Sequence, residues 1–313
     1  MSGFSSPDFW LGVLTIAAIY ATFTLGVQLN MGFTGITNLG QSGFMAVGAY
    51  TMALLVLKAE WPFLLACLAG VVASALFAVL VGLPSLRLPD DYFAIVTLAA
   101  ASIVVIVVQN LVDITGGNNG LSGFDSSWIE LQVKIMEWLE PLGLGNQFAL
   151  PLTLVAWAAF LVLALALRTL QRTPWGRVLR GIREDEVATE ALGKNVLAYK
   201  LQSLAISGMC AAVAGVLMAL NLSVVYPNSF SLDVMFTATA VLLLCGLGSY
   251  LGIAYGAVLM FVVLEGARFA DLPLSSDRVA ALRMIIVGVV LVVTAMYRPQ
   301  GLFGNKQEMV LRG

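Results

Sequence analysis

The chain is dominated by long runs of apolar residues, and these runs limit the folds that it can adopt. Hydrophobic residues make up 60% of its 313 positions and charged residues only 11%, against roughly 25% charged residues in ordinary soluble domains. With a mean hydropathy of +0.94, most apolar side chains must face lipid or other membrane helices. A soluble fold is excluded, and the sequence predicts an all-α polytopic membrane protein that forms one transmembrane domain over residues 1–313.

Nine runs are near the length of about 20 residues that an α-helix needs to cross the hydrocarbon core of a bilayer. Their polar, Gly and Pro borders place them at residues 9–28, 35–57, 62–83, 92–109, 148–168, 200–220, 234–247, 252–269 and 279–297, with eight to ten spans as the range. No Lys or Arg precedes the first run. Because a cleavable secretory signal needs a basic leader, we expect the first span to be retained.

Basic residues are concentrated in one loop. Seven of the sixteen Lys and Arg residues lie between positions 168 and 200. Because Lys and Arg in short loops favour the cytoplasmic side, we expect residues 169–199 and the tail 298–313 to be cytoplasmic. The N-terminus and residues 110–147 are then outside, and the spacing within residues 128–138 predicts a short amphipathic helix on the membrane surface.

Several residue types are missing or scattered, and this excludes whole classes of chemistry. The chain has no His, which removes imidazole catalysis, His-ligated haem and most transition-metal sites. The three cysteines lie far apart in apolar runs, which favours core packing. Gly193-Lys194 lacks the rest of a phosphate-binding loop, so we expect no nucleotide hydrolysis by this chain. No metal, cofactor or nucleic-acid partner is indicated.

A Gly-rich polar stretch, residues 30–49, leads into the second span. Irregular backbone at membrane depth is tolerated where it is buried in protein or lines a watery cavity, and broken helices mark many transport sites. We therefore interpret a small set of residues as a substrate path that offers weak polar contacts to a zwitterion. This set is Asn38, Gln41, Ser42, Gly43 and Thr97. Close helix packing through small residues is the alternative, above all for the glycines.

Few ionisable residues lie within the spans. Glu265, near the outer end of the eighth span, and Arg283, near the outer start of the ninth, fall at similar depth. We predict that they form a structural ion pair, because an isolated charge in lipid is costly. A proton relay is the alternative, but no further ionisable groups continue from the pair, and this favours transport driven by a partner protein.

The basic loop has the features of a docking surface for such a partner. Apolar residues from Pro174 onward recur at helical spacing, and an acidic run then starts a second short helix that ends at a glycine C-cap. Mixed charge beside an apolar stripe is typical of a protein interface. The candidate coupling contacts are Arg180, Arg183, Glu184, Asp185, Glu186 and Gly193. A solvated loop that folds on its own membrane domain is the alternative.

The motifs of the chain occur in the order of a known family. The run from Gly176 to Val196, the earlier Asn38-Leu-Gly segment and the final Tyr297-Arg-Pro segment resemble the M-type permease of bacterial ABC importers for branched-chain and other hydrophobic amino acids. The resemblance covers nearly the whole chain. Gln41 stands where the family often has His, and its amide can form hydrogen bonds but cannot titrate.

This resemblance implies a set of partners and a location. The chain would form a heterodimer with a related H-type permease, contact two ABC ATPase subunits through the coupling loop, and receive substrate from a periplasmic or lipid-anchored binding protein. It would lie in membrane lipid, in the bacterial inner membrane, with a cytoplasmic C-terminus. ATP hydrolysis would belong to the ATPases, so the chain itself would not be an enzyme.

The implied function is therefore movement of branched-chain or other neutral amino acids into the cytoplasm. Urea permeases share the same motifs, so a urea or amide permease is an alternative. Two rivals from other classes also stay open: an ion-coupled secondary transporter, and a structural membrane subunit of a larger enzyme.

Overall fold

The computed structural model describes residues 7–142, 147–269 and 276–297. It is a bundle of long helices, and the only strands among the described residues form one two-residue ladder. The long helices are α1 (Pro7–Val27) with the π-helical turn η2 (Gln28–Thr34), α2 (Gln41–Ala59), α3 (Phe63–Ser85), α4 (Asp90–Asn110), α7 (Leu150–Arg172), α10 (Val196–Leu222), α11 (Leu232–Cys245), α12 (Tyr250–Phe269) and α13 (Ser276–Tyr297). The predicted all-α membrane fold is confirmed.

Every predicted span corresponds to one of these helices. Seven helical segments in the described part are long and apolar enough to cross a membrane, and α12 and α13 contain shorter apolar stretches. The prediction is wrong at the start of the second span, because residues 35–40 are not helical and α2 begins only at Gln41. Gly35 has a φ of 81°, a left-handed conformation that glycine adopts without steric cost, and it ends η2 there.

Helices α1 and α10 lie at the centre of the bundle. Their apolar windows are mostly buried inside the protein, whereas those of α3 and α4 are mostly exposed. Leu68, Leu76 and Ile103 are among the large apolar side chains that α3 and α4 leave uncovered. Because lipid solvates such side chains, this outer layer needs no polar cover.

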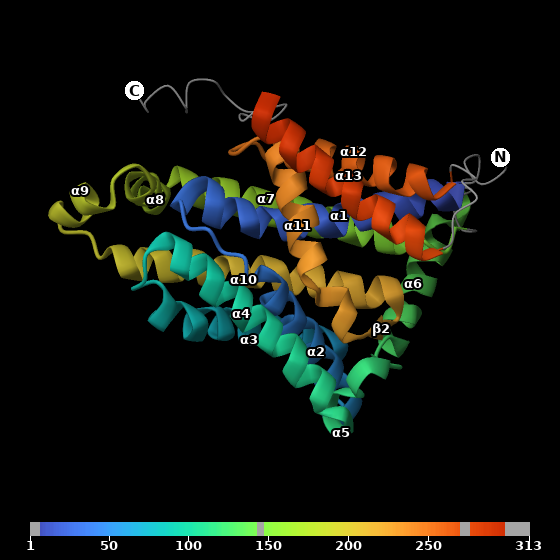
Figure 1. Cartoon of the computed structure of the whole chain (residues 1–313). Coiled ribbons are helices and arrows are strands. Elements are labelled where there is room, and N and C mark those ends of the chain that lie inside the picture. Colours follow the sequence, from blue (N-terminus) through green and yellow to red (C-terminus); the bar gives the residue numbers. More distant parts are fainter. Residues whose placement is uncertain (1–6, 143–146, 270–275, 298–313) are drawn as a thin grey trace.

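The connecting elements collect at the two ends of the bundle. They are α5 (Val112–Thr115), η3 (Gly117–Asn119), β1 (Leu121–Ser122), α6 (Ser126–Leu139), η4 (Glu140–Leu142), α8 (Pro174–Glu184), α9 (Glu186–Ala191), β2 (Val224–Val225) and η5 (Pro227–Phe230). Figure 1 places α8 and α9 at one end and α6 with β2 at the other. Helix α6 includes the predicted amphipathic stretch, and the predicted tail 298–313 lies outside the described residues.

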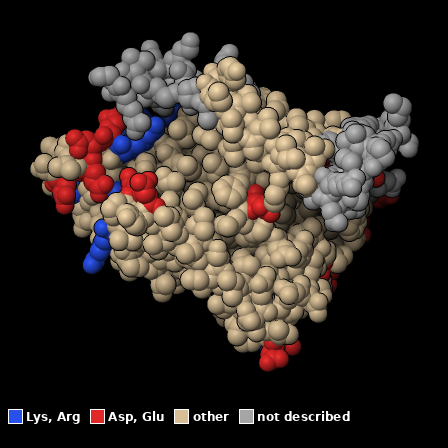
Figure 2. Space-filling model, in the orientation of Figure 1, with Lys and Arg blue, Asp and Glu red and all other residues tan. Residues whose placement is uncertain are grey.

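Charge follows the same division. Figure 2 shows Lys, Arg, Asp and Glu gathered at the α8–α9 end, while most of the visible flank is uncharged. A charged end beside an uncharged flank is the pattern expected of a protein whose flank contacts lipid.

Candidate functional site

The break between α1 and α2 brings polar backbone into the middle of the bundle. Helix α1 and turn η2 end at Thr34, and residues 35–40 then return into the bundle without helical structure. The Gln41 amide, at the start of α2, donates to the carbonyl of Phe23 at 3.0 Å, and Phe23 lies three helical turns before Thr34. Helix α2 therefore begins inside the bundle and not at its end.

A closed hydrogen-bond network holds this break against α10. Asn30 donates to Ser207 at 2.8 Å, Ser207 donates to the Gln41 amide oxygen at 2.9 Å, and Ser203 donates to the Asn30 oxygen at 3.2 Å. The Thr34 and Ser203 hydroxyls are 2.6 Å apart. All five side chains are fully buried, so the network replaces the hydrogen bonds that irregular backbone and amides would otherwise lack.

The structure gives the five predicted path residues different surroundings. Gln41 belongs to the network above, and the Asn38 oxygen accepts from the amide of Gly40 at 2.9 Å. The Thr97 hydroxyl accepts from the amide of Leu39 at 3.2 Å. A Cβ at Gly43 would lie 2.7 Å from the Cα of Ala101. Four of the five thus have a packing or hydrogen-bonding partner inside the protein, although the amide nitrogen of Asn38 has none among the described residues. Ser42 is the fifth.

Ser42 differs because it is completely buried and its hydroxyl has no hydrogen-bond partner in the described part of the chain. It lines a cavity of about 340 Å³ between α2, the middle of α4, and the start of α11. The other lining residues are Ala101, Ser102, Val105, Ile106, Phe230, Ser231, Leu232 and Asp233. The cavity therefore combines an apolar wall with a few polar groups, which is typical of small-molecule sites.

The basic loop of residues 169–199 folds as two short helices, α8 and α9, as the sequence predicts. The Asp185 carboxylate caps α9 by accepting from the amide of Ala188 at 2.9 Å. Glu186 forms a 2.6 Å ion pair with Lys200 of α10. Gly193 follows the end of α9 with a φ of 76°, a conformation that glycine allows. Glu184 is exposed at the junction of α8 and α9.

The two arginines of the loop face the membrane domain. The Arg183 guanidinium donates to the carbonyl of Gly32, and the Arg180 guanidinium lies 5.7 Å from the centre of the Phe33 ring. Both contacts are on η2, directly before the break. Helix α8 is thereby joined to the segment that leads into α2.

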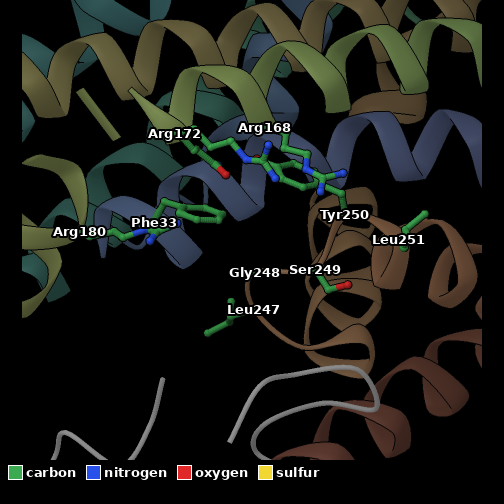
Figure 3. Close-up of a pocket in the computed structure, with 10 residues that line it drawn as sticks. Phe33, Arg168, Arg172, Arg180, Leu247, Gly248, Ser249, Tyr250 and Leu251 are labelled. Carbon is green, nitrogen blue, oxygen red and sulfur yellow. The ribbon is translucent and has the colours of Figure 1, made fainter. Parts of the chain in front are cut away.

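A second cavity opens beside these contacts. It has a volume of about 400 Å³, and Figure 3 shows Arg168 and Arg172 of α7 and Arg180 of α8 around it, with the Tyr250 side chain beside Arg168 and Ser249 further along the wall. The remaining lining residues are Phe33, Gln171, Leu247, Gly248 and Leu251. Basic residues are enriched on the cytoplasmic side of membrane proteins, so these three guanidinium groups agree with the predicted cytoplasmic location of this end of the bundle.

Glu265 and Arg283, predicted as a pair, are brought together. An Arg283 guanidinium nitrogen lies 2.7 Å from a Glu265 carboxylate oxygen, between α12 and α13. Glu265 is buried. Among the described residues no group of Cys, Asp and Glu could hold a metal ion.

With this geometry in view, comparison with known proteins identifies the group to which the chain belongs. A family model described as "Branched-chain amino acid transport system / permease component" matches residues 9–295. The chain is a member of this family. No solved structure matches it.

Three relatives illustrate the extent of the family likeness. The chain is 33% identical over 304 residues to the high-affinity branched-chain amino acid transport system permease protein LivM of Escherichia coli (strain K12), covering 93% of this chain and 69% of that protein. It is 28% identical to a probable LivM permease of Methanocaldococcus jannaschii, with 94% and 93% covered. It is 25% identical to the LivH permease of the same kind of system in Salmonella typhimurium, with 94% of each covered.

One residue of this permease-family chain was missed by sequence reasoning. Asp233 stands one position before the predicted seventh span, residues 234–247, and the sequence gives it no role. In the structure its segment is already inside the bundle, because η5 and the start of α11 line the cavity with Ser42. The signal that could have revealed it is the Pro227-Asn-Ser-Phe sequence, which is typical of a turn and comes directly before the apolar run of the seventh span.

Proposed function

We propose that this chain is the membrane-spanning permease subunit of an ATP-driven importer for branched-chain amino acids. It would pair with a related permease, bind two ATPase subunits at its α8–α9 end, and receive substrate from a binding protein on the opposite face of the inner membrane. The family membership supports this proposal, and so does the likeness to both LivM and LivH, which indicates two related permeases in one system. ATP hydrolysis would take place in the ATPases.

The observation that carries the ATPase contact is the exposed tip of the coupling loop. Val187 of α9 is 76% exposed and Leu192, at its end, is 80% exposed. Glu184 is exposed beside them. Large exposed apolar side chains rimmed by charged residues are typical of surfaces that bind a partner protein. Here they lie at the charged end of a membrane protein, where a groove of an ATPase subunit could cover them.

Movement of this tip would reach the transport path through η2. The Glu186–Lys200 pair joins α9 to α10, and the Arg183–Gly32 contact joins α8 to the break before α2. A rigid-body shift of α8 would therefore displace residues 35–40 and the start of α2, where Ser42 lies. Alternation between outward and inward openings would follow from this connection.

The test replaces the apolar tip without removing the contacts that fold the loop. We expect the double variant Val187→Asp/Leu192→Asp to lose co-purification with the ATPases and to reduce leucine uptake in proteoliposomes by at least about tenfold. Leu88→Asp is the matched control, because Leu88 is an exposed apolar residue in the turn between α3 and α4. Unchanged ATPase binding by the double variant would contradict the assignment.

The same vesicles separate the alternative functions. Leucine uptake should require ATP and loaded binding protein and should survive an ionophore. Uptake that collapses with the ionophore but survives ATP depletion would instead indicate an ion-coupled transporter. Uptake of urea and not of leucine would indicate an amide permease.

A further inference from the structure

The start of α11 has an unusual position for a helix N-terminus. Asp233, in its first turn, lines a cavity of about 470 Å³ together with Tyr20 of α1. Tyr20 lies midway between Pro7 and Thr34, the ends of the continuous α1–η2 helix. The Ser42 cavity, which Asp233 also lines, contacts Ala101 and Ser102 near the middle of α4. These neighbours place the first turn of α11 near the midplane of the bundle.

An exposed carboxylate at this depth needs an explanation. Asp233 is exposed, and its carboxylate forms no hydrogen bond or ion pair with the described residues, whereas Glu265 nearby is paired with Arg283. Ionisable groups at membrane depth are costly and mark transport sites by default. Arg283 lines the 470 Å³ cavity together with Asp233, but its guanidinium pairs with Glu265, so the Asp233 carboxylate is left available to a cationic ligand.

A second polar group in the same cavity also lacks a partner. Ser42 is fully buried, lines the cavity, and its hydroxyl has no hydrogen-bond partner among the described residues. In the first turn of α11 the Val234 amide donates to the carbonyl of Ser231 at 3.2 Å, whereas the amides of Leu232 and Asp233 have no partner within the helix. Ser231, the residue that caps it, makes no side-chain capping bond. Hydroxyls and free amides at a helix N-terminus suit a carboxylate.

The remaining lining of the cavity is apolar. Val105 and Ile106 of α4, Phe230 of η5 and Leu232 of α11 contribute aliphatic and aromatic surface. The cavity therefore presents one acceptor for a cation, several donors for an anion, and an apolar wall beside them. In an α-amino acid the ammonium and carboxylate groups are separated by a single carbon atom. Residues as close in the chain as Ser231 and Asp233 can therefore contact the two groups at the same time, Asp233 the ammonium and Ser231 the carboxylate.

We propose that this cavity is a binding site within the membrane for the zwitterionic head of an apolar amino acid, with Asp233 contacting the ammonium group. Ser42 and the start of α11 contact the carboxylate, and the apolar wall receives the side chain. This inference rests on the proposed function, because it specifies where the permease contacts its substrate. It explains why two polar groups without partners among the described residues, the Asp233 carboxylate and the Ser42 hydroxyl, line one cavity at the depth where transporters bind their substrates.

The test uses the complete transporter, with the partner permease, both ATPases and leucine-loaded binding protein, in proteoliposomes. Replacing Asp233 by Asn keeps the shape of the side chain and removes its charge. We expect leucine transported per ATP hydrolysed to fall at least about tenfold, while complex assembly and stimulation of ATPase activity by the loaded binding protein are unchanged. Asp233→Glu should recover part of the transport, and Ser42→Ala should lower it a few-fold.

Asp113→Asn is the matched control, because Asp113 is an exposed acidic residue of α5 outside the cavity. Wild-type transport per ATP by Asp233→Asn would overturn the proposal. Loss of assembly or of ATPase stimulation in that variant would also overturn it, by showing that Asp233 holds the partner permease. If the wild-type complex moves no leucine at all, the proposed function fails instead, which separates the two conclusions.

Discussion

Two polar regions lie next to each other at the start of α2, and they are built in opposite ways. Gln41 belongs to a network in which Asn30, Ser203, Ser207 and Gln41 are all hydrogen-bonded. Ser42, the next residue, lines a cavity in which its hydroxyl has no partner. The network satisfies its own polar groups and so has a structural role, whereas the cavity leaves polar groups available for a ligand. Burial alone does not distinguish the two regions, because every one of these side chains is buried.

The largest expected effect on stability comes from comparing a paired carboxylate, that of Glu265, with an unpaired one, that of Asp233. Glu265→Gln removes the buried partner of a partly exposed pair and leaves Arg283 without its carboxylate, so we expect a loss of about 3 kcal/mol in stability, at the lower end of the range for buried pairs. Asp233→Asn should not lower stability, because Asp233 has no partner to lose. Thermal unfolding of the purified complex measures both. If the charge-swapped variant Glu265→Arg/Arg283→Glu recovers none of the stability lost by Glu265→Arg, the pairing contributes nothing.

A smaller loss of stability is expected from a substitution at Gly40, the residue directly before Gln41 of the network and Ser42 of the cavity. A Cβ at Gly40 would collide with the carbonyl of Thr97, whose carbon it would approach to 2.9 Å. Because both groups belong to packed backbone, Gly40→Ala should cost about 2 kcal/mol and move the start of α2 away from α4. Gly12→Ala is the control, since a Cβ there meets no atom within 4 Å. Equal unfolding temperatures for the two variants would contradict the packing argument.

The smallest effect concerns adjacent residues of α2. Gln41→Leu removes the hydrogen bonds to Phe23 and Ser207, and we expect it to cost about 1 kcal/mol, in the range measured for side-chain hydrogen bonds inside membrane proteins. Ser42→Ala should leave the unfolding temperature unchanged while lowering transport. If the two variants exchanged these phenotypes, the assignment of network and cavity would have to be reversed.

Much of the architecture could be predicted from the sequence, because membrane-crossing helices are defined by long apolar runs. The start of α2 was misplaced because residues 35–40 mix small, polar and apolar residues just as the first turn of the following helix does, so composition marks no boundary between them. Contacts with distant residues, such as the hydrogen bonds from Gln41 to Phe23 and from Leu39 to Thr97, show that they re-enter the bundle. The position of Gly193 after α9 could be predicted, since a helix C-cap depends on local sequence.

The candidate site was less predictable, for a physical reason. Whether a polar side chain is satisfied depends on neighbours more than a hundred residues away, as in the contact between Gln41 and Ser207. The sequence predicts a substrate path within the polar stretch of residues 30–49, although Asn30 and Gln41 of this stretch belong to the structural hydrogen-bond network. The sequence could not predict that Asp233 lies near the midplane of the bundle. Its position there depends on η5, a short turn that the periodicity of apolar residues does not detect.

The antiparallel ladder of β1 and β2 has a mechanical consequence. It pairs Leu121 with Val225 and Ser122 with Val224, and Val225 is separated from η5 by a single residue. Because the ladder joins β1 to β2, a displacement of the segment around β1 would be passed to η5, which forms one wall of the cavity. In the proposed transporter, a binding protein seated at this end of the bundle would thus act on the first turn of α11, so that delivery of substrate and preparation of the cavity would be coupled.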